Sequence, residues 1–262
     1  MARTKQIARK HSSGVKRKRT PEDDAADTGS GNEQPQKKSA TANAAANSRA
    51  GQTVYDKTIA KDGPEKLAER FTDAIKKQKG DLSTIELEDE SLPPKAFKDT
   101  TGFGETRLAK NLSDFLEQYT PDGREGLKSC AEETGSPHTI LLTSSAIRAQ
   151  ALLQQVRAYG SEDNKIAKLF AKHLKLKDHI QYVQKTKFGI GAGTAHRIQH
   201  LIENEVLKLK HLKRVVIDGS YVDDKQRTIF TDRDAFLPTL SLLNLDQLKL
   251  RLVSSETELL VF

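Results

Sequence analysis

The sequence predicts an α/β domain built on a single parallel sheet with helices on both faces. From residue 139 onward, short apolar segments typical of buried strands alternate with segments whose apolar residues have helical spacing. Such alternation favours a parallel sheet, because each helix packs back onto the sheet between two strands. The expected strands are Thr139–Thr143, Phe188–Gly191, Leu212–Ile217, Leu248–Val253 and Glu258–Phe262.

Helices are expected where a capping residue precedes apolar residues at helical spacing. Ser144 or Ser145 can cap one helix and Thr194 a second, while Arg233–Leu243 forms a third. The segment Lys165–Leu176 alternates lysine with apolar residues, and its pattern fits either a helix or a strand.

The region before this sheet divides into a tail and a helical extension. Before Val54 the only large aliphatic residues are Ile7 and Val15, which is too little apolar surface to offset the entropy of ordering the chain. We therefore expect a disordered basic tail at 1–55, a helix and acidic linker at 56–91, and the α/β domain at 92–262.

The extension should contain one amphipathic helix, and the α/β domain should open with another. Asp62 or Gly63 can cap a helix that ends near Gly80. The acidic stretch Leu82–Pro94 is typical of a linker because it closes with two prolines. The second helix is indicated by the apolar spacing of Leu108, Leu112, Phe115 and Leu116.

Positive charge is concentrated at the N-terminus. The chain carries a net charge of +7, and its first twenty residues hold eight Lys and Arg and no acid. Without them the net charge is −1, so a field that attracts RNA or acidic partners is expected to come mainly from the tail. The candidate tail residues for nuclear import or partner binding are Arg3, Lys5, Arg9, Lys10, Lys16, Arg17, Lys18 and Arg19.

Several classes of protein are disfavoured by composition. Cys130 is the single cysteine, so neither an internal disulfide nor a zinc site with several cysteines can form, which fits the reducing cytosol or nucleus. The sequence has no apolar run of about 18 residues and no apolar N-terminal stretch, so we expect neither a membrane span nor a signal peptide.

A glycine-rich turn is predicted at Gly191–Arg197, between a strand and a helix. Glycines let a backbone approach a ligand closely, and free N–H groups at a helix start attract phosphate. Arg197 lies in the first helical turn and could add charge, although a purely structural capped turn explains the same residues. The candidates for contact with RNA or a partner are Ser145, Gly193, Thr194 and Arg197.

The chain lacks the residues that usually bind and hydrolyse a nucleotide. A phosphate-binding loop needs Gly-Lys followed by Ser or Thr, and the chain contains no Gly-Lys pair. Asp218 is followed by Gly219, which cannot act as a general base. His196 and His200 are spaced for one helix face, but Arg197 stands where a zinc-peptidase motif needs Glu. We therefore expect no catalytic residue, cofactor or metal, and a protein that is not an enzyme.

Residues from about 92 to 262 resemble the first RecA-like lobe of DEAD-box RNA helicases. Ser145, Ala149 and Gln150 resemble part of motif Ia, usually Pro-Thr-Arg-Glu-Leu-Ala-Gln. Gly193, Thr194 and Arg197 match motif Ib, Asp218 is the one match in motif II, and Ser254–Glu256 stands where Ser-Ala-Thr would fall. The resemblance implies a single RecA-like lobe. With no second lobe expected, nothing would close over ATP.

The departures from the helicase motifs are themselves similar to the Cms1-type family. They are Asp218, Ser220, Tyr221, Asp223 and Lys225, together with Phe97–Thr101 and Gly135–His138. That family comprises degenerate helicase relatives of the 90S pre-ribosome, or small-subunit processome. The resemblance implies a nucleolar factor of early 40S assembly whose partners are pre-ribosomal proteins and pre-rRNA or snoRNP.

The tail carries a second resemblance, and two alternative functions stay open. Residues 2–10 differ from the core-histone tail ARTKQTARK only at Ile7, which suggests contact with a histone reader. A basic arm for import or RNA contact explains the same residues, helped by Lys16–Arg19. The alternatives to a ribosome assembly factor are an RNA-dependent ATPase and a chromatin-associated protein.

Overall fold

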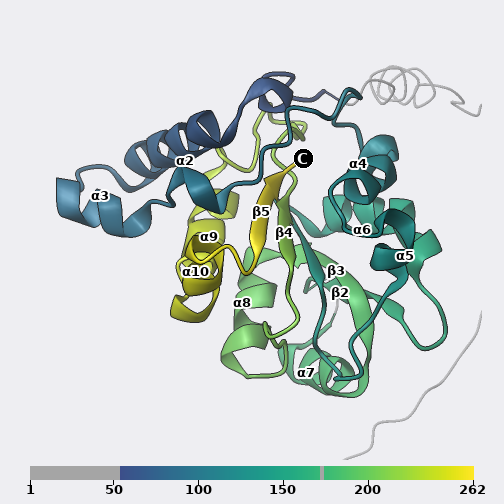
Figure 1. Cartoon of the computed structure of the whole chain (residues 1–262). Coiled ribbons are helices and arrows are strands. Elements are labelled where there is room, and N and C mark those ends of the chain that lie inside the picture. Colours follow the sequence, from purple (N-terminus) through teal and green to yellow (C-terminus); the bar gives the residue numbers. More distant parts are fainter. Residues whose placement is uncertain (1–53, 172–173) are drawn as a thin grey trace, which may run out of the picture. The chain divides into compact units, whose positions relative to one another are not determined.

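The computed structural model describes residues 54–171 and 174–262 (Figure 1). The predictions for the basic tail, including its histone-like stretch, concern residues 1–53 and lie outside the described residues. Tyr55 belongs to the domain, because it forms an antiparallel bridge with Tyr221. No helix in the described ranges is long and apolar enough to cross a membrane.

Five parallel strands form one sheet in the order β2-β3-β1-β4-β5. The sheet confirms the predicted α/β class and the single RecA-like lobe. All five strands are short, and β1 and β4 are completely buried, as expected for a sheet covered on both faces. The strands are β1 (Thr139–Thr143), β2 (Lys165–Leu169), β3 (Phe188–Thr194), β4 (Arg214–Ile217) and β5 (Glu258–Val261).

Helices cover the two faces of the sheet, and alternate strand residues point into the two cores. Leu141 packs on one side with α4 (Leu112–Gln118), α5 (Gly123–Lys128) and α6 (Ala146–Gln155). Leu142 packs on the other side with α2, α7, α8, α9 and α10 (Figure 1). These helices are α2 (Pro64–Lys79), α7 (Leu176–Lys185), α8 (Ala195–Glu203), α9 (Arg233–Leu243) and α10 (Asp246–Val253). Short 3-10 turns lie at Ile59–Lys61, Pro94–Ala96, Ala109–Asn111 and Arg157–Tyr159.

Helix α2 begins as predicted, with Gly63 at its cap and Pro64 in its first turn. It packs on the core of the sheet through Phe71. The Phe71 ring lies 6.1 Å from the ring of Phe230 and 5.3 Å from that of Phe236, measured between centroids. The extension before residue 92 therefore shares the hydrophobic core of the α/β domain.

The segment 248–253 and the acidic linker differ from the predictions. The segment 248–253 was expected to be a strand because leucines alternate with charged residues, but it lies in helix α10. Leu248 and Leu252, four residues apart, are buried, whereas Leu250 is 70% exposed. The expected acidic linker contains helix α3 (Thr84–Glu90), because Ser83 and Glu86 form a capping box at its start.

The predicted glycine turn is also wrong in its extent, because β3 continues through Gly193 to Thr194. Gly193 pairs with Leu169 of β2, and a Cβ added to Gly193 would lie 1.9 Å from the Leu169 carbonyl oxygen. The ambiguous segment from Lys165 forms strand β2. Helix α7, which follows it, has no counterpart among the predicted helices.

Candidate functional site

The starts of helices α6 and α8 lie side by side at the carboxyl edge of the sheet. Strands β1 and β3 are parallel neighbours, and Thr143 is the register partner of Thr194. The ends of the two strands and the starts of α6 and α8 line a cavity of about 280 Å³ with Asp234 and Pro238 of α9. Open α/β sheets commonly bind ligands at this edge, so this cavity is the candidate site.

Two of the predicted contact residues, Ser145 and Thr194, line this cavity and are half-buried. The Ser145 hydroxyl accepts a hydrogen bond of 3.2 Å from the Arg148 amide and caps α6, as predicted. Thr194 stands at the N-cap of α8, but its side chain makes no capping bond. Thr143 links the start of α6 to the end of β3, because its hydroxyl lies within hydrogen-bond distance of the carbonyls of Ser145 and Gly193, at 3.0 and 3.2 Å.

Replacing Ser145 with alanine should lower the free energy of unfolding by about 1 kcal/mol, because α6 loses its capping acceptor. Urea titration measures this change. Ser144→Ala is the matched control, since Ser144 is also half-buried and caps no described helix. Equal losses in the two variants would contradict a capping role for Ser145.

The other two predicted contact residues, Gly193 and Arg197, are buried. The Arg197 guanidinium donates to the Leu174 carbonyl at 3.0 Å and lies 3.2 Å from Nδ1 of His179. Burial, followed by the charge of Arg197, lowers the pKa of His179 to about 4, so this imidazole is neutral at pH 7. Arg197 thus ties α8 to the segment that leads into α7.

Asp218, at the end of β4, forms a buried ion pair that the sequence reasoning missed. Its two carboxylate oxygens accept hydrogen bonds of 2.7 and 2.9 Å from Nε and Nη2 of Arg148 on α6. The Arg148 guanidinium also lies over the ring of Tyr221, 4.3 Å from its centroid. Burial raises the pKa of Asp218, and the hydrogen bonds from Arg148 oppose that rise. The sequence signal that could have indicated this pair is an arginine on the apolar side of α6, next to Ala149.

Gly219 leaves no room for a side chain. A Cβ at this position would lie 2.5 Å from Cγ1 of Val261 and 3.0 Å from Cε2 of Phe230. The space in which a general base would stand is therefore filled by apolar side chains.

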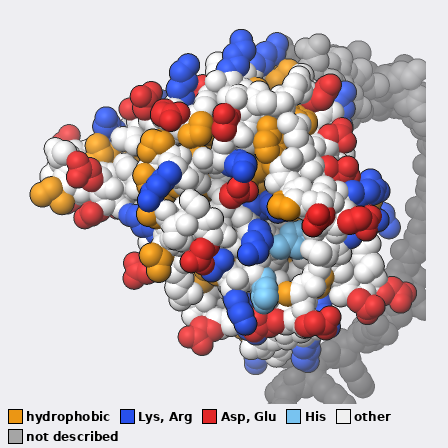
Figure 2. All heavy atoms as spheres, in the orientation of Figure 1, with side chains coloured by type: hydrophobic (Ala, Val, Ile, Leu, Met, Phe, Trp, Pro, Cys, Tyr) orange, Lys and Arg blue, Asp and Glu red, His pale blue; other side chains and the backbone are white. Residues whose placement is uncertain are grey.

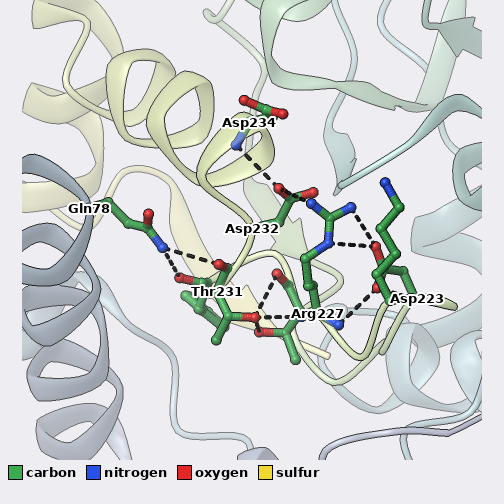
Figure 3. A network of polar contacts seen from close by, with 9 residues as sticks. Gln78, Asp223, Arg227, Thr231, Asp232 and Asp234 are labelled. Carbon is green, nitrogen blue, oxygen red and sulfur yellow. Dashed lines mark hydrogen bonds and ion pairs between the residues drawn. The ribbon is translucent and has the colours of Figure 1, made fainter.

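The loop after β4 is organised by ion pairs around Arg227 (Figure 3). Asp223 accepts hydrogen bonds from Nε and Nη2 of Arg227, at 3.1 and 2.8 Å, and Asp232 accepts one from Nη1 at 2.8 Å. On the other side of the network, Gln78 of α2 donates to the Thr231 carbonyl at 3.2 Å. Asp223, one of the residues similar to the Cms1-type family, therefore stabilises this loop through its hydrogen bonds with Arg227.

Among the described residues, the histidine pair on α8 is not part of a larger cluster of metal-ligating side chains. The rings of His196 and His200 are both exposed, with centroids 6.5 Å apart. Within residues 54–171 and 174–262, no group of three or more His, Cys, Asp and Glu is placed to hold a metal ion.

Comparison with known proteins shows the family to which this chain belongs. The model of the family described as "CMS1: U3-containing 90S pre-ribosomal complex subunit" matches residues 2–262. Protein CMS1 of Chaetomium thermophilum is 33% identical over 68% of this chain and 70% of its own length. Protein cms1 of Schizosaccharomyces pombe is 30% identical over 66% and 60%, and human Protein CMSS1 is 33% identical over 55% and 49%. The chain therefore belongs to the CMS1 family of 90S pre-ribosomal complex subunits.

Proposed function

We propose that this protein is a non-enzymatic factor of early small-subunit assembly in the nucleolus. Its membership of a family of pre-ribosomal complex subunits gives it a role in ribosome biogenesis. The finer assignment depends chiefly on one observation, which is that Arg148 occupies both carboxylate oxygens of Asp218.

The ion pair argues against nucleotide hydrolysis. The carboxylate at the end of this strand is the group that would approach a nucleotide-bound Mg²⁺ in a helicase lobe. Here the carboxylate is buried, and a cation would have to displace Arg148 and take its place. The filled space beside Gly219 and the lack of a Gly-Lys pair support the same conclusion.

Since the site lacks the groups for hydrolysis, we infer that the carboxyl edge of the sheet serves to bind a partner. Ser145 and Thr194 are the two predicted contacts that line its cavity, and a helix start there favours an anionic group. Gly193 and Arg197 hold the edge in shape through their packing and hydrogen bonds. We propose that pre-ribosomal proteins or pre-rRNA bind this edge, with the basic tail as a second contact.

Two measurements on the full chain test the proposal. The tagged protein should co-sediment with U3 RNA in the 90S fraction of a cell extract and concentrate in nucleoli until rRNA transcription is blocked. Calorimetry with Mg-ATP should show no heat of binding. Micromolar binding with RNA-stimulated hydrolysis would instead identify an ATPase, and even staining of chromatin would favour the histone-like tail.

A further inference from the structure

Exposed lysines follow one another from the edge strand β2 to the end of helix α7, and none of them lines the candidate cavity. We define the β2–α7 surface by Lys165 of β2, Lys175 at the cap of α7, and Lys177 and Lys185 of α7. All four side chains are exposed, and none lies within ion-pair distance of a carboxylate in the described part of the chain. The stretch from 165 to 187 contains seven lysines and one acid, Asp178.

This surface differs in charge from the rest of the domain. Residues 54–262 contain thirty-two Lys and Arg against thirty-one Asp and Glu. Because the stretch 165–187 alone has an excess of six positive charges, the remainder of the domain has an excess of five negative charges. On the face seen in Figure 2, acidic and basic side chains are interspersed. The near-zero total therefore hides one concentrated positive region.

Two lysines at the start of helix α7 are in positions that destabilise the helix. Lys175 occupies its N-cap and Lys177 its first turn, where the helix dipole is positive and acidic residues are preferred. Lysines on an edge strand can serve to prevent pairing with other strands, which accounts for Lys165 and Lys168. That explanation does not extend to α7. An anion bound at the start of α7 would interact favourably with both the lysines and the helix dipole.

We propose that the β2–α7 surface binds the phosphate backbone of RNA. This inference rests on the proposed function and assigns RNA contact to residues outside the candidate cavity. Lysines are point charges that suit successive phosphates without reading sequence. Tyr182, 38% exposed on the same helix, offers a ring on which a base can stack. RNA is favoured over an acidic peptide because no described residue gives this surface a planar Arg fork for carboxylates.

The test compares two triple variants of the full chain that lose equal charge. The first is Lys175→Gln with Lys177→Gln and Lys185→Gln. The control is Lys66→Gln with Lys77→Gln and Lys95→Gln, three lysines that are likewise exposed and without an ion pair in the described residues. Fluorescence anisotropy with a labelled single-stranded RNA of about 20 nucleotides, across a salt series, gives the affinities.

The first variant should bind RNA at least about tenfold more weakly than wild type. Its slope of log affinity against log salt should be smaller by about 2, because about 0.7 ion is released per phosphate contact. The control should keep both values, and equal results for the two variants would overturn the inference. Binding of a labelled polyglutamate peptide is measured in the same way. If the first variant lost polyglutamate binding but kept RNA binding, the inference would also be overturned, and an acidic protein partner would be indicated. Failure of the wild type to co-sediment with 90S particles would count against the proposed function alone.

Discussion

Replacement of Arg148 with alanine should lower the free energy of unfolding by about 3–5 kcal/mol, the largest loss expected from a single polar side chain here. The variant leaves the Asp218 carboxylate buried, with no hydrogen-bond donor in place of the two N–H groups. It also removes the cation from the face of Tyr221. Urea or guanidinium unfolding followed by circular dichroism measures the loss.

Two further variants separate the ion pair from general damage to the helix. Arg157→Ala removes an exposed arginine just beyond α6 and should cost less than about 0.5 kcal/mol. The double variant Arg148→Met with Asp218→Leu should recover most of the lost stability, since no charge remains buried. If Arg148→Ala cost no more than Arg157→Ala, the ion pair would not hold the edge together.

The stability deficit of Arg148→Ala should depend on pH. Without Arg148 nothing opposes burial, so the pKa of Asp218 in the folded state rises further above its ordinary value. A raised carboxyl pKa means that the folded state binds the proton more tightly than the unfolded state does, so acid favours folding at this group. The difference from wild type should therefore shrink as the pH is lowered from neutral towards the ordinary pKa of an aspartate. A constant difference would show that Asp218 does not take up the proton.

Gly193→Ala should destabilise the domain by about 3 kcal/mol or more, because its Cβ would meet the backbone of the neighbouring strand. The Leu169 carbonyl oxygen would lie 1.9 Å away, so β2 and β3 would have to separate. Gly104→Ala is the control, with no atom within 4 Å of the added Cβ. Thermal unfolding compares the two. A Gly193→Ala protein that kept its stability but lost RNA binding would return Gly193 to the role of a contact residue.

The sequence predicts the strands well where burial on both faces leaves a continuous apolar run. Thr139–Thr143 and the end at 258–262 are examples. It fails at 248–253, where period-two alternation of leucine and charge also satisfies a helix that buries only Leu248 and Leu252. Helix α7 was missed because its charged residues obscure the apolar spacing of Leu176, Ile180 and Val183.

The candidate site could be predicted only in outline. Ser145 and Thr194 follow from capping preferences and strand order, which are local signals. Arg148 and Asp218 are seventy residues apart, and their pairing depends on β1 and β4 being neighbours in the sheet. Net charge does not reveal the lysines between 165 and 187, because a sum over the domain cannot show how charge is distributed along it.

The packing of α2 has a consequence for synthesis on the ribosome. Phe71 is translated early, yet the aromatic rings that it meets at Phe230 and Phe236 come about 160 residues later. The amide of Gln78 likewise bonds the carbonyl of Thr231. A nascent chain must therefore carry the apolar face of α2 without these partners until most of the domain has been made, which makes this face a natural target for chaperones during translation.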